Sequence, residues 1–215
     1  MGGMSFTERL RETTEWEEAT RHRFVREYRD GILDDAVFRD YLVDDYAFLE
    51  TGARVTALAA ADAPTMDAMS RLAEQLGVLT GGENDYFVRA FDELGVPTDE
   101  YEDPDLHPTT EAFVDFMLRV AREGGYEETL ASVLAAEWVY LDWCEYAAEA
   151  DYDRWYLDEW VELHIVDAFA EYVDWLRSEL DGRGPRLSDD RTDRVAEVFA
   201  RTVELEARFF DAAYR

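Results

Sequence analysis

Apolar residues recur along almost the whole chain at a spacing of three or four residues. This spacing matches the 3.6 residues of an α-helical turn, and the alternating apolar runs that indicate strands are absent. Glycine and proline fall between the periodic segments, where helices end. The sequence therefore predicts an all-α, single-domain bundle of about eight helices, at about 5–29, 34–60, 64–78, 83–95, 109–123, 127–149, 152–181 and 188–214.

The charge of the chain limits its possible partners. It holds 51 acidic and 21 basic residues, for a formal charge of −30, and every basic residue counted here is arginine. Nucleic-acid binding is not expected, because it needs a basic patch. A hydrophobic content of 47% supplies a core, so the carboxylates must coat a folded surface. Such a coat suits a salt-rich cytoplasm, as in a halophilic archaeon, where salt screens the repulsion.

Cysteine content and hydropathy indicate the compartment. Cys144 is the single cysteine, which excludes a disulfide within the chain. No signal peptide and no apolar run of about 18 residues is present. We therefore expect a cytoplasmic protein without a membrane partner.

The segment YLVDDYAFLE at 41–50 carries two adjacent aspartates within an apolar run. On a helix they separate by about 100°. Asp44 aligns with the polar residues Asp40 and Thr51, whereas Asp45 aligns with Phe38 and Leu49. We expect Asp44 to face water and Asp45 to face the core.

The same alignment places two glutamates on apolar helix faces. Glu206 aligns with Phe199 and Phe210, and Glu137 aligns with Val133. One such carboxylate would normally be a structural residue paired with an arginine or a tyrosine. Three of them, with few arginines on the inner faces, favour a polar cavity at the centre of the bundle. With aromatic walls, this cavity would suit a flat, nitrogen-rich aromatic ligand.

Ordered segments along nearly the full chain resemble the TenA (thiaminase II) family. They are Trp16, His22-Arg23-Phe24, Gly31-Ile32-Leu33, Phe38, YLVDDYAFL, AEWVY at 136–140, 160–169 and EARFFDAAY at 206–214. Asp45 takes the position of the family's active-site aspartate, and Glu206 that of its catalytic glutamate. The resemblance implies a fold similar to haem oxygenase and a homotetramer. It also implies hydrolysis at the methylene of a 2-methyl-4-aminopyrimidine, without a cofactor or metal.

The chain departs from the better-known branch of that family at its cysteine nucleophile. Ala136 occupies the position of this cysteine, and Cys144 lies about 12 Å further along the helix by rise. A second branch lacks the cysteine and is thought to use a glutamate, for which Glu137 is the candidate here. The preference reported for that branch, aminomethyl- or formylaminomethyl-pyrimidine over thiamin, implies salvage hydrolysis.

The resemblance also selects the substrate-binding residues. Phe113 and His164 stand where the family has two tyrosines, and Phe48 replaces a third, whereas Tyr140 is retained. An aromatic residue at helical spacing is more often part of the core, so these four are retained on the resemblance alone.

A mechanism follows as a hypothesis. Asp45 would bond the amidine-like edge of the pyrimidine, and Glu137 would act as general base on water. Glu206, with Tyr140, would orient or protonate the departing amine. Two other interpretations stay open: a non-catalytic pyrimidine or thiamin sensor that has lost its nucleophile, and a di-iron enzyme. The second is disfavoured because Glu-x-x-His pairs are absent.

Overall fold

The computed structural model describes residues 3–214, and α-helices make up the fold, with no strand in this range. The all-α prediction is therefore confirmed. The helices are α1 (Phe6–Glu12), α2 (Trp16–Thr20), α3 (Arg23–Arg29), α4 (Asp35–Asp62), α5 (Met66–Leu79), α6 (Gly82–Leu94), α7 (Thr98–Glu102), α8 (Pro108–Glu123), α9 (Tyr126–Ala147), α10 (Trp155–Ile165), α11 (Asp167–Arg183) and α12 (Asp189–Ala212), with a 3₁₀ turn at Gly184–Arg186.

The predicted helix over 5–29 is wrong in its continuity, because the segment forms α1, α2 and α3. After α1, the hydroxyls of Thr13 and Thr14 donate to the carbonyls of Leu10 and Arg11, which ends the helix. Before α3, Nδ1 of His22 accepts from the amide of Phe24 and caps the new helix. Periodicity alone does not show such side-chain bonds to the backbone.

Two further boundaries differ from the prediction. The segment 152–181 is divided at Val166, whose extended backbone (φ −62°, ψ 145°) separates α10 from α11. The predicted loop over 97–108 contains the short helix α7. Both differences leave α4, α8, α9 and α12 close to where the sequence predicts them.

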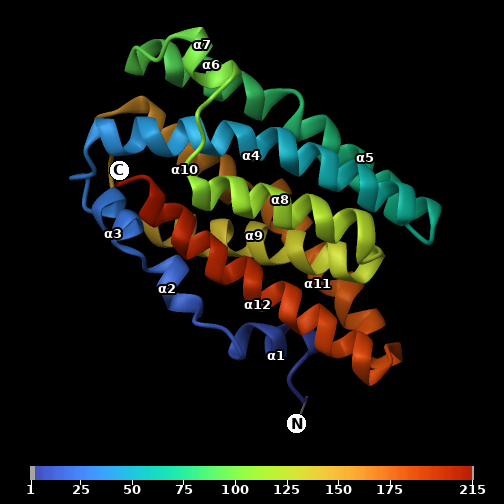
Figure 1. Cartoon of the computed structure of the whole chain (residues 1–215). Helices are drawn as coiled ribbons and strands as arrows, with labels where there is room; N and C mark the ends of the chain where they lie inside the picture. Colours follow the sequence, from blue (N-terminus) through green and yellow to red (C-terminus); the bar gives the residue numbers. More distant parts are fainter. Residues whose placement is uncertain (1–2, 215) are drawn as a thin grey trace.

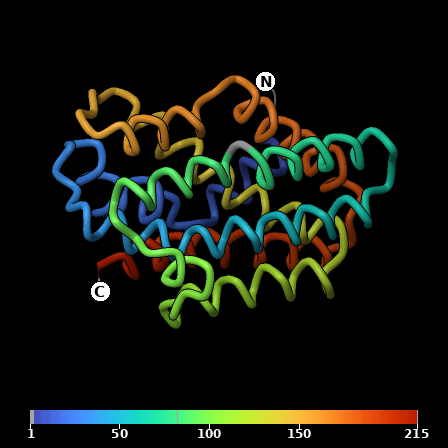
Figure 2. The backbone as a smooth tube through the Cα atoms, turned by 90° about the horizontal axis from the view of Figure 1, so that it is seen from above, coloured from blue at the N-terminus to red at the C-terminus, as the bar shows by residue number. Residues whose placement is uncertain are grey.

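Helix α9 lies inside the bundle. In Figure 1, α4, α8 and α12 run across the front and α9 lies behind α8 and α12, and Figure 2 shows α8 and the pair α10 and α11 on opposite sides. The helices α4, α8, α10, α11 and α12 all pack against α9. Residues 129–135 are buried without interruption. Side chains on neighbouring helices can therefore converge around the middle of α9.

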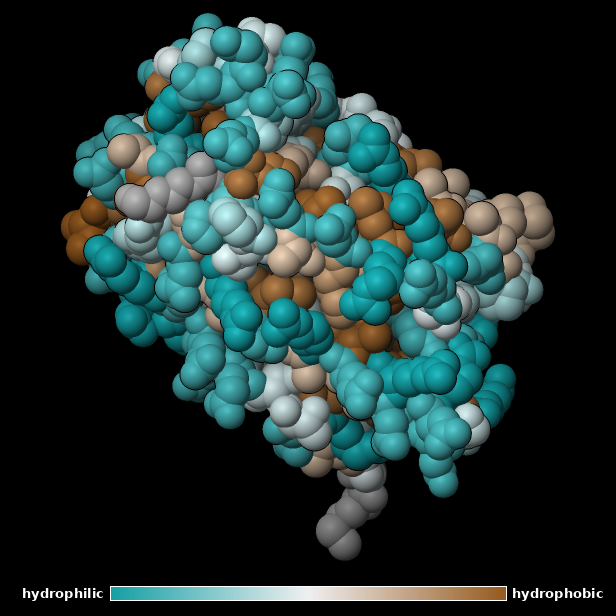
Figure 3. All heavy atoms as spheres, viewed as in Figure 1, coloured by the Kyte–Doolittle hydropathy of each residue, from teal (hydrophilic) through white to brown (hydrophobic). Residues whose placement is uncertain are grey.

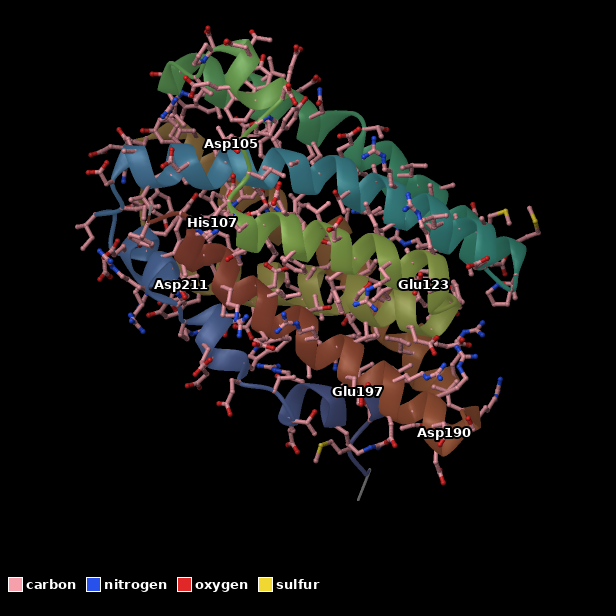
Figure 4. All side chains as sticks on the ribbon, in the orientation of Figure 1. Asp105, His107, Glu123, Asp190, Glu197 and Asp211 are labelled. Carbon is pink, nitrogen blue, oxygen red and sulfur yellow. The ribbon has the colours of Figure 1, made fainter. Side chains whose placement is uncertain are left out.

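The outer surface carries the acidic coat. Hydrophilic residues cover most of the face in Figure 3, with hydrophobic side chains visible between them. Glu123, Asp190, Glu197 and Asp211 are exposed on the outside of α8 and α12 (Figure 4). Within the described residues, no helix is long and apolar enough to cross a membrane.

Candidate active site

The two aspartates of YLVDDYAFLE are both buried, so the prediction that Asp44 faces water is wrong. Asp44 is 2% exposed and accepts a hydrogen bond from the Thr110 hydroxyl at 2.7 Å. Thr110 belongs to α8, which packs against the face of α4 that carries Asp44. A polar stripe on α4 thus meets a polar residue of another helix, which the alignment of one helix cannot reveal.

Asp45 lies on α4 next to two tyrosines. The Tyr140 hydroxyl lies 3.1 Å from Oδ1 of Asp45 and donates to it, and it lies 2.9 Å from the hydroxyl of Tyr41. Burial, then the negative charge of Glu83, raises the pKa of Asp45 well above its usual value, and the bond from Tyr140 opposes this rise. Asp45 therefore binds a proton readily and can share it with a ligand.

An interior pocket of about 100 Å³ lies between α4, α8, α9, α10 and α12. It is lined by all seven residues that the sequence selects: Asp45, Phe48, Phe113, Glu137, Tyr140, His164 and Glu206. The structure thus brings the whole predicted set to one cavity. Their catalytic and binding roles stay predictions.

The pocket walls are aromatic. The ring centroids of Phe48 and Phe113 lie 4.4 Å apart, and Phe209 lies 5.2 Å from Phe48. On another side, the ring of Tyr140 lies 5.2 Å from that of His164. The indole N–H of the buried Trp160, also in the lining, has no acceptor among the described residues. Such walls suit a planar ring that offers acceptors as well as donors.

Glu137 and Glu206 face the pocket without a partner, since neither carboxylate has a hydrogen bond or ion pair within residues 3–214. Burial and then the charge of Asp45 raise the pKa of Glu137 to about 7. Glu206 is 2% exposed, and burial followed by the charges of Asp45 and Glu137 raises its pKa well above the usual value. A carboxyl group whose pKa lies near neutrality can act as acid or base at neutral pH.

Glu83, at the start of α6, is a pocket residue that the sequence analysis missed. Burial, then the charge of Glu137, raises its pKa to about 8. Acidic residues are common in the first turn of a helix, so the position of Glu83 does not by itself indicate a pocket residue. The alignment test would nevertheless have found it, because Glu83 shares a helix face with four fully buried residues: Tyr86, Phe87, Ala90 and Phe91.

His164 is neutral and has a fixed tautomer. Nδ1 lies 2.8 Å from the carbonyl oxygen of Trp160, and a carbonyl can only accept, so Nδ1 carries the proton. Burial lowers the pKa of His164 to about 4. At neutral pH Nε2 therefore holds a free lone pair.

Ala136 lines the pocket, whereas Cys144 does not. Cys144 is fully buried, and burial raises the pKa of its thiol well above the usual value. A thiol in this state is inert, so Cys144 is a core residue. Among the described side chains, no group of three His, Cys, Asp or Glu is close enough to hold a metal ion.

A much wider surface groove, of about 1180 Å³, lies between the N-terminal helices and α12. Its lining mixes charges that are already paired: Arg11 and Arg21 both bind Asp142, and Arg23 binds Glu27. It holds none of the predicted site residues. The smaller interior pocket, with its unpaired carboxylates, is the better candidate for chemistry.

Comparison with known proteins agrees with this arrangement. The profile of the TENA/THI-4/PQQC family matches residues 10–215. An aminopyrimidine aminohydrolase from Halalkalibacterium halodurans is 30% identical over 98% of this chain and 96% of its own. A TenA homologue from Pyrococcus furiosus superposes with a TM-score of 0.89 at 25% identity, covering 97% of this chain and 100% of its own.

A more distant structure indicates the wider fold class. A domain of unknown function with a heme oxygenase-like fold from Shewanella denitrificans superposes with a TM-score of 0.75 at 16% identity, over 99% of this chain and 93% of its own. The haem-oxygenase-like fold expected from the sequence is therefore confirmed. The chain belongs to the TENA/THI-4/PQQC family.

Proposed function

We propose that this chain is an aminopyrimidine aminohydrolase of thiamin salvage, which converts aminomethyl- or formylaminomethyl-pyrimidine to hydroxymethylpyrimidine. The observation that carries the proposal is the pocket with aromatic walls whose lining brings together Asp45, Glu137 and Glu206. The 30% identity to the aminopyrimidine aminohydrolase from Halalkalibacterium halodurans supports it.

In this proposal Asp45 binds the amidine-like edge of the pyrimidine. Its raised pKa lets it share a proton with a ring nitrogen, which draws electrons from the exocyclic methylene. The C–N bond to the methylene breaks with its electron pair remaining on nitrogen, and a water oxygen bonds to the carbon. For the aminomethyl substrate the balance is R–CH₂–NH₃⁺ + H₂O → R–CH₂–OH + NH₄⁺. For the formylaminomethyl substrate it is R–CH₂–NH–CHO + H₂O → R–CH₂–OH + H₂N–CHO.

Two glutamates divide the proton transfers. Glu137 takes a proton from the attacking water, since its pKa of about 7 leaves it partly ionised at neutral pH. Glu206, with the hydroxyl of Tyr140, orients the departing ammonia of the aminomethyl substrate, whose nitrogen is already protonated. With the formylaminomethyl substrate it protonates the departing nitrogen. Ala136 removes the thiolate route, so activated water replaces a covalent intermediate.

The test measures product release by chromatography, in molar KCl, from aminomethylpyrimidine, formylaminomethylpyrimidine and thiamin. We expect Glu137→Gln and Glu206→Gln each to lower kcat on the order of 10²- to 10⁴-fold. Glu145→Gln and Glu204→Gln are matched controls, because these glutamates are exposed on the same two helices. Full activity in Glu137→Gln would reject the glutamate as replacement for the cysteine. Binding without turnover in the wild type would indicate a pyrimidine sensor.

We further propose that the protein acts as a homotetramer in a salt-rich cytoplasm. The formal charge of −30 supports the high-salt setting, since a coat of this charge requires screening. Light scattering in 2 M and 0.2 M KCl tests the assembly. A monomer at both salt concentrations would reject the tetramer.

A further inference from the structure

A second cavity, of about 200 Å³, adjoins the pocket of the proposed active site. Three side chains line both cavities: Glu83, Glu137 and His164. They therefore form the boundary between the inner pocket, which holds Asp45, and the outer cavity. Glu83 and Glu137 lie close enough to Asp45 for their charges to affect one another, so a ring bound at Asp45 would direct a substituent towards this boundary.

The boundary presents hydrogen-bond acceptors. The carboxylates of Glu83 and Glu137 have no hydrogen bond or ion pair among the described residues, and only burial and negative charge alter their pKa values. His164 is neutral, and its Nδ1 proton is already used by the Trp160 carbonyl. Its remaining nitrogen can only accept. Three acceptors thus surround the passage from pocket to cavity.

The arginine in the lining of the outer cavity is already engaged with other side chains. Arg71 lines the outer cavity, but it pairs with Glu74 at 3.4 Å and lies over the ring of Tyr172 at 5.6 Å. In the inner pocket, Glu206 is 2% exposed and also unpartnered, and a nearby cation would favour its ionised form. The same holds for Glu83 and Glu137, whose pKa values of about 8 and about 7 leave them largely or partly protonated at neutral pH in the ligand-free protein. A cation that donates hydrogen bonds stabilises their ionised forms, so the cavity system favours such a ligand.

We propose that Glu83, together with Glu137 and His164, binds the protonated aminomethyl group of the substrate, and that Glu83 makes the site prefer cationic over neutral substituents. This inference rests on the proposed function. An alkylammonium has N–H donors and no acceptor, so it can donate to the ionised carboxylates and to the free nitrogen of His164. The ammonium is also the form of the nitrogen that can leave as neutral ammonia when the C–N bond breaks.

Glu83 is the residue that isolates the effect, because it takes no part in the proposed proton transfers. Glu137 and Glu206 serve the chemistry, so their replacement would lower turnover of every substrate. Replacement of Glu83 by glutamine removes the charge, keeps the shape and leaves an acceptor oxygen. A cationic substrate should lose more than a neutral one.

The experiment compares kcat and KM for aminomethyl- and formylaminomethyl-pyrimidine in wild type and Glu83→Gln. We expect kcat/KM for the cationic amine to fall on the order of ten- to a hundredfold, mainly through KM, and kcat/KM for the neutral formamide to change by less than about threefold. Retained turnover of formylaminomethyl-pyrimidine shows that the variant is folded. Glu74→Gln is the matched control, since Glu74 lines the outer cavity but is exposed and paired with Arg71.

Two results would overturn the assignment: an unchanged kcat/KM for the amine, or equal losses for both substrates. If the wild type hydrolyses neither compound, the proposed function fails. In that case, equilibrium binding of the same two compounds tests separately whether Glu83 binds the ammonium group. Weaker binding of the amine alone in Glu83→Gln supports its role, and equal affinities in both proteins reject it.

Discussion

At the scale of single residues, the proposed role of Glu137 as general base predicts how the reaction depends on pH. It must lose its proton to act as a base, and its pKa is raised to about 7 by burial and then by Asp45. With the neutral formylaminomethyl substrate, we expect kcat to rise as pH increases from about 6 to 8. A pH–rate profile measures this rise. The three other pocket carboxylates, Asp45, Glu83 and Glu206, face the same space, so the variant Glu137→Gln must lose the rise if Glu137 is its source.

The same residue is expected to reduce the stability of the ligand-free protein. The pKa of Glu137 is raised in the folded state, so between about pH 4.5 and 7 the folded chain binds more protons than the unfolded chain. Stability therefore falls as pH rises through this window. At pH 8, Glu137→Gln should increase the free energy of unfolding by about 1–3 kcal/mol. Denaturant unfolding at pH 5 and pH 8 checks this, with Glu145→Gln as control, and an equal effect at both pH values would contradict it.

At the scale of helices, Asp142 joins the N-terminal helices to α9. Its carboxylate accepts from the indole of Trp16 at 2.9 Å, from Arg21 at 2.8 Å and from Arg11 at 3.1 Å. The arginines are over a third exposed, so their pairs contribute little, and the bond from the buried Trp16 matters more.

We therefore expect Asp142→Ala to lower the free energy of unfolding by about 1–2 kcal/mol. Faster hydrogen exchange should be confined to α1 and α2, because α9 keeps its other neighbours. Urea unfolding and hydrogen exchange measure both effects. Faster exchange throughout α9 would show that Asp142 supports more than the N-terminal helices.

The elements also show how far sequence reasoning reaches. Alignment on single helices placed Asp45, Glu137 and Glu206 correctly, because each helix has one face towards the shared core. It failed at Asp44, since the residue that covers it, Thr110, is 66 positions away along the chain. The analysis missed Glu83 at the start of a helix, although Glu83 shares a helix face with buried apolar residues. The sequence thus predicted which segments form helices. It did not predict the contacts between helices or the side-chain hydrogen bonds that end them.

At the scale of the whole molecule, net charge should make stability depend on salt. Acidic residues outnumber basic ones 51 to 21, so repulsion over the surface exceeds the attraction within ion pairs. At 1 M salt the screening length is about 3 Å, against about 10 Å at 0.1 M. We expect Tm to rise by several degrees, about 5–15 °C, between 0.1 M and 2 M KCl. Calorimetry tests this against a non-ionic osmolyte at equal osmolality, and an unchanged Tm in KCl would contradict it.

The enclosed position of α9 has a consequence for heat inactivation. Glu137 and Tyr140 project from α9, and other helices pack around α9 on several sides. Local opening of a loop or a terminus therefore cannot displace these two side chains. Amides in such a helix exchange with solvent mainly through global unfolding. Loss of the proposed active-site arrangement and loss of the fold should therefore be a single cooperative event. Warming should not produce a population that is folded but inactive.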